Sequence, residues 1–554
     1  MDNQRQILLV ALGVILLLLW FQWEDAQRAS LPVAESPVTE QGLSGGEAPS
    51  VPTAPTARPA GRNAKTDTPR VTSPPKKEMA SGRRIRVLTD LLDVQIDTYG
   101  GDLRFLGLRQ HPNELNNPDV PFPLMQDKGD EILIAQSGII GYGKNYPFHR
   151  TLFSTGRTDY TLREGQDSLS VDLNWRAKDG VSYTKRYTFK RNSYVVRVDF
   201  LVNNRSRAKW QGYLYGQFLK KPVEKKSGFL ALPTFDGGAI YTNEDQYEKV
   251  TYDEMADEPL DRKVTGGWAA MMQHYFVSSW MPEADQPGQI YSSSPSPEHY
   301  VIGYKFTEPL TVAPGQQGQV GIDLFAGPKE TDRLKQLVEG MDLTVDFGWL
   351  TFISAPLYWL LTAINSLIGN LGVSIIILTI MIKAVFFPLN NAQYKSMAKM
   401  KKVQPRMKAL KEQYGSDRER YSKAMMELYK KEKINPMSGC LPILVQIPVF
   451  IALYWVLLES VEMRQAPFAL WIQDLSAKDP YFVLPILMGA SMFVTTWMSP
   501  ATDPMQRKLF LMMPVVFTVF FLFFPAGLVL YWLVNNVLQI IQQTYINRSM
   551  AASK

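Results

Sequence analysis

The chain has 554 residues, of which 45% are hydrophobic, and a formal net charge of +6. It is too long for one ordinary domain, and its apolar residues form blocks that long polar stretches separate. The single cysteine, Cys440, excludes an intrachain disulfide. The sequence contains no HExxH motif, no P-loop and no Cys/His cluster, so we expect no metal site and no cofactor.

The first apolar block, residues 7–23, follows Arg5 and can just cross a thin bilayer as a helix. A cleaved signal peptide is the competing interpretation, but Trp20, Phe21 and Trp23 stand where small residues would precede a cleavage site. We therefore predict an uncleaved transmembrane anchor over residues 1–28. Residues 29–82 are rich in Pro, Ala, Ser, Thr and Gly, which predicts a disordered linker.

Short runs of alternating apolar and polar residues begin at Arg83 and continue over about 250 residues, which one all-β domain can accommodate. Val94-Gln95-Ile96-Asp97 is an example, and Gly, Asn and Asp residues separate the runs. This pattern predicts an antiparallel β-sandwich domain over residues 83–345. Residues 330–341 have helical character and would link this domain to the membrane.

The remaining part, residues 346–554, predicts a helical membrane core. We expect an interfacial helix at 349–366 and transmembrane helices at 371–388, 437–458, 481–498, 509–524 and 527–546, which makes six crossings with the N-terminal anchor. The loop at 391–436 carries thirteen basic and five acidic residues and should be cytoplasmic by the positive-inside rule. Both termini would then be cytoplasmic, with the β-domain on the other side of the membrane.

The basic loop has the pattern of two amphipathic helices. Apolar residues recur at three- and four-residue steps from Met397 to Tyr414, Gly415 ends the first helix, and Ser416 with Glu419 forms a capping-box signature for the second. One interpretation is that this hairpin sets topology and touches anionic lipid. The other is a docking arm for a ribosome or targeting factor, with salt-sensitive binding. In the second interpretation the docking residues are Lys399, Lys401, Lys402, Arg406 and Lys408.

A lysine interrupts the apolar block at residues 371–388. At the bilayer centre, the charge of Lys383 would cost about 2.5 to 3.5 kcal/mol on insertion scales. Near the cytoplasmic end, its side chain would instead extend to the interface at little cost. Other crossings also carry polar or amphipathic side chains, with helical spacing in several cases, and no Asp or Glu lies within the spans. Each is most simply an interhelical hydrogen bond, but together they indicate a hydrated groove. The groove residues are Lys383, Thr379, Gln446, Trp532 and Asn536.

Five stretches of the chain are distinctive: MDNQRQILL, NAQYKSMAKMKKVQPRMKAL, NPMSGCLPILVQIPVFIALYWVL, RQAPFALWIQDLSAKDPYFVLPILMG and FFPAGLVLYWLVNN. They resemble the YidC membrane-protein insertase family in its Gram-negative form. The resemblance implies a non-enzymatic insertase and foldase of the inner membrane, with the β-domain in the periplasm as a supersandwich. Its partners would be nascent membrane proteins, the Sec translocon, the ribosome and targeting factors, and no sequence-specific nucleic acid.

The resemblance also implies a role for individual groove residues. Lys383 would be the positive charge that draws in acidic residues of a client, with Thr379, Gln446 and Trp532 as groove or client contacts. Many relatives have arginine at the position of Lys383. A buried lysine can lose its proton where an arginine cannot, so this groove must stay wet to remain charged.

Two other functions fit parts of the sequence. A transporter with Lys383 as its substrate or proton site would show inverted repeats with paired broken helices, and we find none. An enzyme in the β-domain, acting on sugars, would bring histidine and carboxylates together in a pocket. The four histidines, His111, His149, His274 and His299, share no motif.

Overall fold

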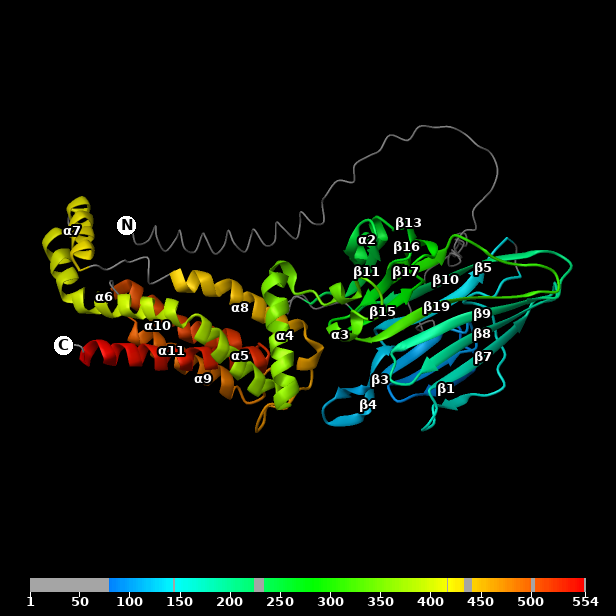
Figure 1. Cartoon of the computed structure of the whole chain (residues 1–554), viewed down its shortest axis with the longest axis horizontal. Helices are drawn as coiled ribbons and strands as arrows, with labels where there is room; N and C mark the ends of the chain where they lie inside the picture. Colours follow the sequence, from blue (N-terminus) through cyan, green and yellow to red (C-terminus); the bar gives the residue numbers. More distant parts are fainter. Residues whose placement is uncertain are drawn as a thin grey trace, which may run out of the picture. The chain divides into compact units, whose positions relative to one another are not determined.

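The computed structural model describes residues 79–142, 145–223, 234–415, 417–432, 441–499 and 504–552. The predicted anchor at residues 1–28 and most of the predicted linker at 29–82 lie outside the described residues. The described part contains a β-rich region, with strands between Arg84 and Pro328, and a helical region that begins with α4 (Thr351–Ile368) (Figure 1).

The β-rich region contains two sheets among the described residues. In the first, the order is β13 (Asp261–Thr265), β16 (Pro287–Ser296), β17 (His299–Phe306), β10 (Trp210–Lys221), β5 (Ile132–Ile140), β3 (Leu103–Glu114), β2 (Leu92–Asp97), β1 (Arg84–Leu88) and β6 (Asp159–Thr161), with β18 (Leu310–Val312) beside β10 and β4 (Asn117–Met125) beside β3. In the second, it is β12 (Gln246–Val250), β11 (Gly237–Thr242), β14 (Trp268–Met272), β15 (Phe276–Met281), β19 (Gln317–Pro328), β9 (Val195–Asn204), β8 (Val181–Lys190) and β7 (Ser168–Arg176). Paired strands run antiparallel, except that β1 and β6 are parallel.

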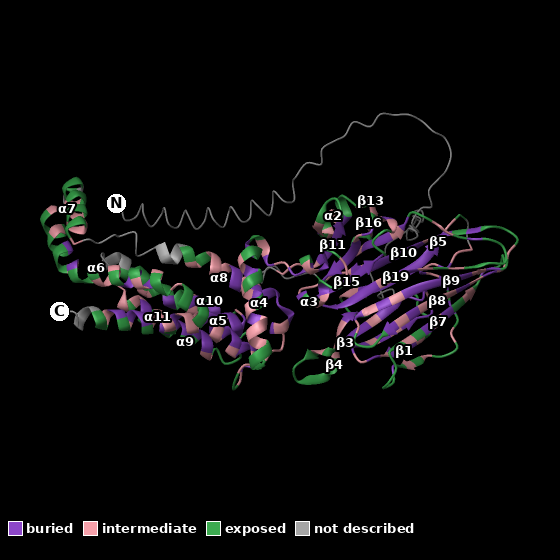
Figure 2. Cartoon of the chain, viewed as in Figure 1, coloured by how far each residue is buried: buried purple, intermediate pink, exposed green. Residues whose placement is uncertain are grey.

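Alternation of side chains builds the core of this region. In β8, every second residue from Val181 to Phe189 is buried, because successive side chains of a strand point to opposite faces. Large aromatic side chains fill the interior, where Phe218 of β10 packs against Trp280 of β15 with ring centroids 5.9 Å apart. Buried residues follow the strands in Figure 2. The predicted β-rich domain is confirmed.

Two short helices modify that prediction. The first, α2 (Tyr252–Asp257), was not expected; its N-terminus is closed by a capping box between Thr251 and Glu254. The second, α3 (Thr331–Leu334), is shorter than the helical segment expected at residues 330–341. Turns follow α3 up to Gly340, whose φ of +75° favours glycine, and a 3₁₀ helix then covers Met341–Thr344.

The helical region contains α4 and seven further helices among the described residues. They are α5 (Leu371–Val385), α6 (Phe387–Tyr414), α7 (Arg418–Lys431), α8 (Leu441–Glu459), α9 (Val483–Met498), α10 (Pro504–Phe521) and α11 (Ala526–Ala552). Gly369, with φ of +70°, ends α4, and the side chain of Asn370 caps α5 by accepting a hydrogen bond from the Val373 backbone N–H at 3.0 Å. Figure 1 shows α4 running across the direction of α5 and α11.

Length and composition alone identify few spanning helices among the described residues. The segment Gly348–Ile368 is long and apolar enough to cross a bilayer, and it coincides with the predicted interfacial helix. A second span is counted if α5 and α6 together form one span, which would be bent by 67° at their junction. Val445–Glu459 and α9 are shorter apolar helices. A helix of α9's 16 residues is about 24 Å long, less than the roughly 30 Å hydrocarbon core, so the six crossings stay a prediction.

The two helices of the basic segment pack through a small apolar cluster. Val403 and Met407 of α6 are buried there, and partly buried side chains surround them: Met400, Met425, Leu428 and Tyr429. The N-cap of α7 is Asp417, whose carboxylate accepts hydrogen bonds from the backbone of Glu419 and Arg420, both at 3.1 Å. The cap is therefore one residue later than the predicted Ser416, which lies outside the described residues.

We predict that Gly216→Ala destabilises the β-rich region. A Cβ on Gly216 would lie 2.5 Å from Cδ2 of the Trp280 ring, which is buried and cannot move aside. Overpacking of this kind costs about 1 to 3 kcal/mol, which urea unfolding followed by tryptophan fluorescence would detect. Gly156→Ala is the matched control, because no atom lies within 4 Å of its added Cβ. Equal unfolding midpoints for the two variants would contradict this account of the core.

Candidate functional site

The first part of the site is a buried cation in α5. Lys383 is 8% exposed. Among the described residues, its ammonium group makes no hydrogen bond or ion pair. Thr379, one turn earlier, is 1% exposed, and its hydroxyl donates to the Ile375 carbonyl at 2.6 Å. Because that proton is used within the helix, the Thr379 hydroxyl is left as an acceptor.

Two amide bridges tie α11 to its neighbours. Gln446 of α8 donates from Nε2 to Oδ1 of Asn535 at 3.2 Å. The next residue, Asn536, is 5% exposed and donates from Nδ2 to Oγ of Ser491 in α9 at 3.1 Å. The predicted groove residues Gln446 and Asn536 therefore make interhelical hydrogen bonds, which is the simpler alternative that the sequence left open. Asn535 and Ser491 also belong to the polar residues at helical spacing, which is the sequence pattern that indicated polar contacts within the bundle.

Trp532 lies one turn before Asn536 in an aromatic cluster. Its ring meets Phe450 of α8 edge-on, with centroids 4.7 Å apart, and Phe521 of α10 at 5.6 Å. The indole Nε1 is buried and has no hydrogen-bond partner in the described part of the chain. No sequence pattern singled out Phe450 or Phe521, because aromatic residues are common throughout these helices.

The predicted residues thus fall into two groups. Gln446, Trp532 and Asn536 gather around α11, which also packs against α5, α8 and α9. Lys383 and Thr379 lie on α5, and no described hydrogen bond connects them to the α11 group. The chemistry available is that of one cation, several amides and an indole N–H inside a mostly apolar bundle.

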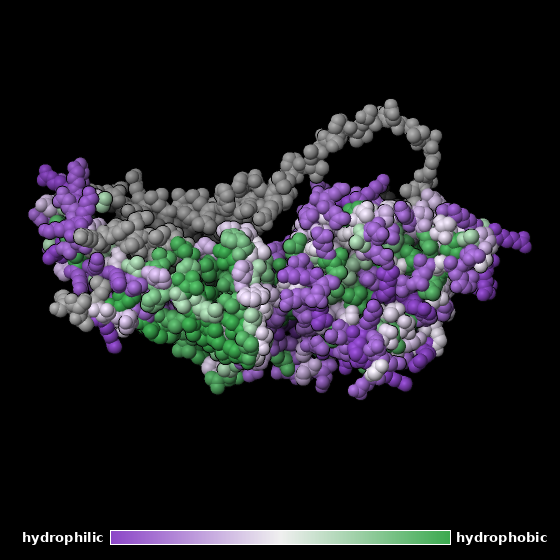
Figure 3. Space-filling view, viewed as in Figure 1, coloured by the Kyte–Doolittle hydropathy of each residue, from purple (hydrophilic) through white to green (hydrophobic). Residues whose placement is uncertain are grey.

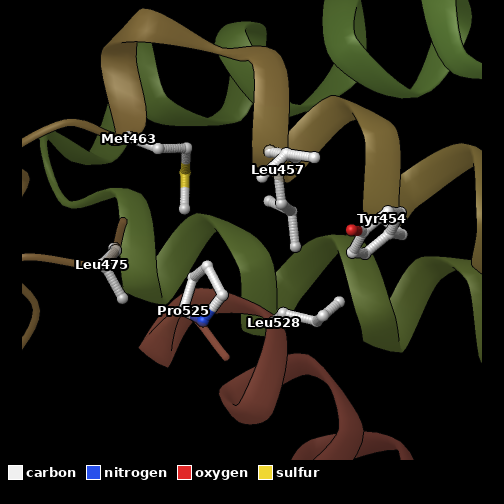
Figure 4. Close-up of a pocket in the computed structure, with 7 residues that line it drawn as sticks. Tyr454, Leu457, Met463, Leu475, Pro525 and Leu528 are labelled. Carbon is white, nitrogen blue, oxygen red and sulfur yellow. The ribbon is translucent and has the colours of Figure 1, made fainter. Parts of the chain in front are cut away.

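One end of the bundle is closed by apolar packing. Figure 4 shows Tyr454, Leu457 and Met463 facing Leu475, Pro525 and Leu528 across a cavity of about 10 Å³, which is near the space that one water needs. Backbone hydrogen bonds join two of these segments. The Ala526 N–H donates to the Ala477 carbonyl at 2.7 Å, and the Gly527 N–H donates to the Leu475 carbonyl at 2.9 Å. We expect little passage of solvent at this end.

The predicted docking residues lie on the outer side of α6. Lys399, Lys401, Lys402, Arg406 and Lys408 are all exposed. Arg406 also reaches Glu432, beyond the end of α7, with Nη1 and Oε1 2.5 Å apart, so this residue helps to hold the two helices together. The four lysines form an exposed basic surface along α6.

Comparison with known proteins identifies the family. Residues 84–360 match the family model described as the YidC periplasmic domain, and residues 363–553 match the one described as 60Kd inner membrane protein. A membrane protein insertase YidC from Stutzerimonas stutzeri is 50% identical over 562 residues, which cover 100% of this chain and 99% of that protein. The chain belongs to the YidC family.

A second curated YidC protein has a similar identity, and a solved structure of a YidC protein matches more distantly. The membrane protein insertase YidC of Alkalilimnicola ehrlichii is 48% identical over 554 residues, which cover 100% of this chain and 96% of that one. A crystal structure of an active YidC insertase with its first transmembrane domain resolved has 20% identity and a TM-score of 0.40, and covers 84% of this chain and 92% of that chain. The family resemblance predicted from the sequence is confirmed, as is a bacterial inner-membrane protein with a β-rich periplasmic domain.

The enzyme alternative finds no support in this YidC-family chain. The described residues contain no group of three or more His, Cys, Asp or Glu side chains suited to a metal ion. His149 lies 2.7 Å from the Tyr215 hydroxyl and His299 lies 2.8 Å from Ser296, while His274 stacks on its neighbour Tyr275. Burial lowers the pKa of His149 to about 4, so its ring is neutral at neutral pH. YidC relatives are named as insertases, which are not enzymes.

We predict that Asn536 and Ser491 are energetically coupled. Removing either side chain breaks the same buried hydrogen bond, so the double variant Asn536→Ala/Ser491→Ala should cost less than the two single variants added together. Couplings of this kind in membrane bundles average about 0.6 kcal/mol and reach about 1.7. Unfolding of the four proteins in detergent micelles would measure it. Strict additivity would show that the bond contributes nothing to the bundle.

Proposed function

We propose that this protein inserts newly made transmembrane segments into the bacterial inner membrane through a hydrated groove that holds one positive charge. The observation that carries the proposal is Lys383, a cation buried in an apolar helix with no counter-charge among the described residues. Membership of a family whose relatives are named membrane protein insertases gives the reaction class. The family assignment also speaks against a transporter.

The charge supplies the attraction. An acidic residue in the translocated tail of a client would meet Lys383 in surroundings less polar than water, where a pair of opposite charges interacts more strongly. Thr379 offers a hydroxyl acceptor next to it, and Trp532 offers an unused N–H donor among the described groups. The apolar part of the client would then leave sideways into lipid, because hydrocarbon is the favourable environment for it.

Short helices assist the same step. As ideal helices, α5 and α9 would be about 22 to 24 Å long, so lipid beside them would have to thin or the flanking residues would have to reach the interface. A thinner bilayer shortens the apolar distance that the polar tail of a client crosses. The closed apolar junction in Figure 4 is compatible with a groove that does not open outward.

The proposed organisation follows the sequence. It comprises an N-terminal anchor at residues 1–28, a linker at 29–82, the periplasmic β-domain at 83–345 and the membrane core at 346–554. Six crossings with both termini in the cytoplasm place the α6–α7 hairpin on the ribosome's side of the membrane. We assign the ribosome, targeting factors and the Sec translocon as partners on this basis, with a foldase role for clients that need it.

We predict that Lys383→Glu impairs clients selectively. The reversed charge repels acidic tails, so insertion of a single-span client with two acidic tail residues should fall about tenfold, whereas a neutral-tailed client should change less than about twofold. Insertion into proteoliposomes, scored by protease protection, is the measurement. Lys383→Arg is the control and should keep at least half of the activity, because it keeps the charge. Equal losses of insertion for both clients would contradict the attraction mechanism.

We predict that the exposed lysines of α6 bind ribosomes electrostatically. Replacing Lys399, Lys401, Lys402 and Lys408 by glutamate should weaken co-sedimentation with ribosomes and flatten its dependence on salt, because fewer counterions are released from RNA. Arg406 is left unchanged, since it pairs with Glu432. The matched control reverses four basic residues of α7: Arg420, Lys423, Lys430 and Lys431. If ribosome binding survives the α6 substitutions, the hairpin acts on topology and lipid instead.

A further inference from the structure

The connection between α8 and α9 contacts the β-rich region through an arginine. The two regions belong to one compact unit of the chain, although Figure 3 shows a broad hydrophobic surface over the helical region and a largely hydrophilic one over the β-rich region. Arg464 follows the 3₁₀ helix Val461–Met463, and its Nη2 donates to the Pro112 carbonyl of β3 at 2.7 Å. A charged side chain of the helical region is therefore bonded to the backbone of the β-rich region.

Two aromatic rings hold the same guanidinium group. Its Cζ lies 5.1 Å from the centroid of the Phe122 ring in β4 and 5.7 Å from that of the Phe276 ring in β15, and the two rings stack on each other at 4.4 Å. A cation over an aromatic face is attracted electrostatically, and more strongly where water is excluded. The ring of His111 also contacts Phe276, at 5.6 Å. Burial, and next the charge of Arg464, lower the pKa of His111 to about 4, so at neutral pH this ring does not repel the guanidinium.

The next residue has an unfavourable backbone conformation. Gln465 has a φ of +57°, a region that residues with a side chain rarely adopt. Two hydrogen bonds hold it there. Its backbone N–H donates to Asp474 Oδ1 at 3.0 Å, and its side-chain Nε2 donates to the Pro112 carbonyl, also at 3.0 Å. A strained backbone persists only where its surroundings restrain it, and here the β-rich region supplies part of the restraint.

The restrained connection is one wall of the closed junction in Figure 4. Met463, the residue before Arg464, lines that junction together with Leu475, and both side chains are buried. The Leu475 N–H donates to the Ala466 carbonyl at 3.0 Å, and the Leu475 carbonyl accepts from the Gly527 N–H at 2.9 Å. A continuous run of contacts therefore leads from the β-rich region, through the α8–α9 connection, to the start of α11.

We propose that Arg464 is a positioning residue, which fixes the α8–α9 connection on the β-rich region and thereby keeps the junction in Figure 4 closed. In this role the β-rich region stabilises one end of the helical bundle without taking part in client insertion by Lys383. The alternative is that apolar packing alone closes the junction. The two accounts differ in what the loss of the guanidinium group does, because Arg464 does not line the junction itself.

The test measures how fast a charged maleimide labels a buried cysteine in the full-length protein in mild detergent, with Cys440 replaced by alanine. Leu475→Cys reports on the junction, and Leu378→Cys, buried in α5, reports on unfolding of the bundle as a whole. We expect Arg464→Ala to raise labelling of Leu475→Cys about tenfold, since it removes both a charged hydrogen bond and the ring contacts. Labelling of Leu378→Cys should change less than about twofold.

A second variant alters the same contact from the β-rich region. Phe122→Leu removes the ring beside the guanidinium group and keeps an apolar side chain, so it should raise labelling of Leu475→Cys about threefold. Added to Arg464→Ala, it should raise labelling little further, because both substitutions remove one contact. Arg464→Lys keeps a charge and a donor and should label more slowly than Arg464→Ala.

Two controls separate this role from other causes. Arg157→Ala removes a cation–ring contact within the β-rich region, 5.3 Å from the Tyr160 ring centroid, and should leave the junction protected. Lys383→Glu should leave it protected as well, which distinguishes this result from a failure of the insertion mechanism. Unchanged labelling in both contact variants, an equal rise for Leu378→Cys, or an equal rise in Arg157→Ala would overturn the proposal. Because the contact is altered from two sides, misfolding of one variant leaves the other to decide.

Discussion

The free energy of placing a charge among apolar helices is the constraint on which the membrane half of this protein depends. Lys383 is almost completely buried in α5, and no described group neutralises it. A bundle optimised for stability alone would have an apolar residue at this position, since a buried charge without a partner is strongly destabilising. In the proposed mechanism, water or an incoming anion offsets this cost, and both need an opening in the bundle.

The polar side chains of the bundle divide between two tasks. Two hydrogen-bonded pairs, Gln446 with Asn535 and Asn536 with Ser491, fix α11 between α8 and α9. Trp532 keeps an unused N–H among the described groups, held in place by two phenylalanine rings. In the proposed mechanism, α11 forms a wall of the groove: the bonded groups hold the helix in place, and the Trp532 N–H remains available for a client.

The two regions of the chain solve the burial problem with different periodicities. In the β-rich region, every second residue points inward, and large aromatic side chains such as Trp280 and Phe218 fill the space between sheets. In α4, α5, α8 and α9, apolar residues surround most of each helix, because the outer surface meets lipid and not water. Most of the polar groups in this bundle are paired, and Lys383 and the Trp532 N–H are exceptions that pairing among the described residues does not explain, which is why they point to function.

The sequence by itself determined the division into a β-rich and a helical region, the family, and the identity of Lys383 as an unusual residue. These follow from periodicity and composition, which act locally along the chain. It could not decide that Gln446 and Asn536 are bonded while the Trp532 N–H has no partner in the described part of the chain, or that Arg406 pairs with Glu432. Each of those depends on the distance and angle between side chains from different helices or turns, and helix packing sets these only in three dimensions.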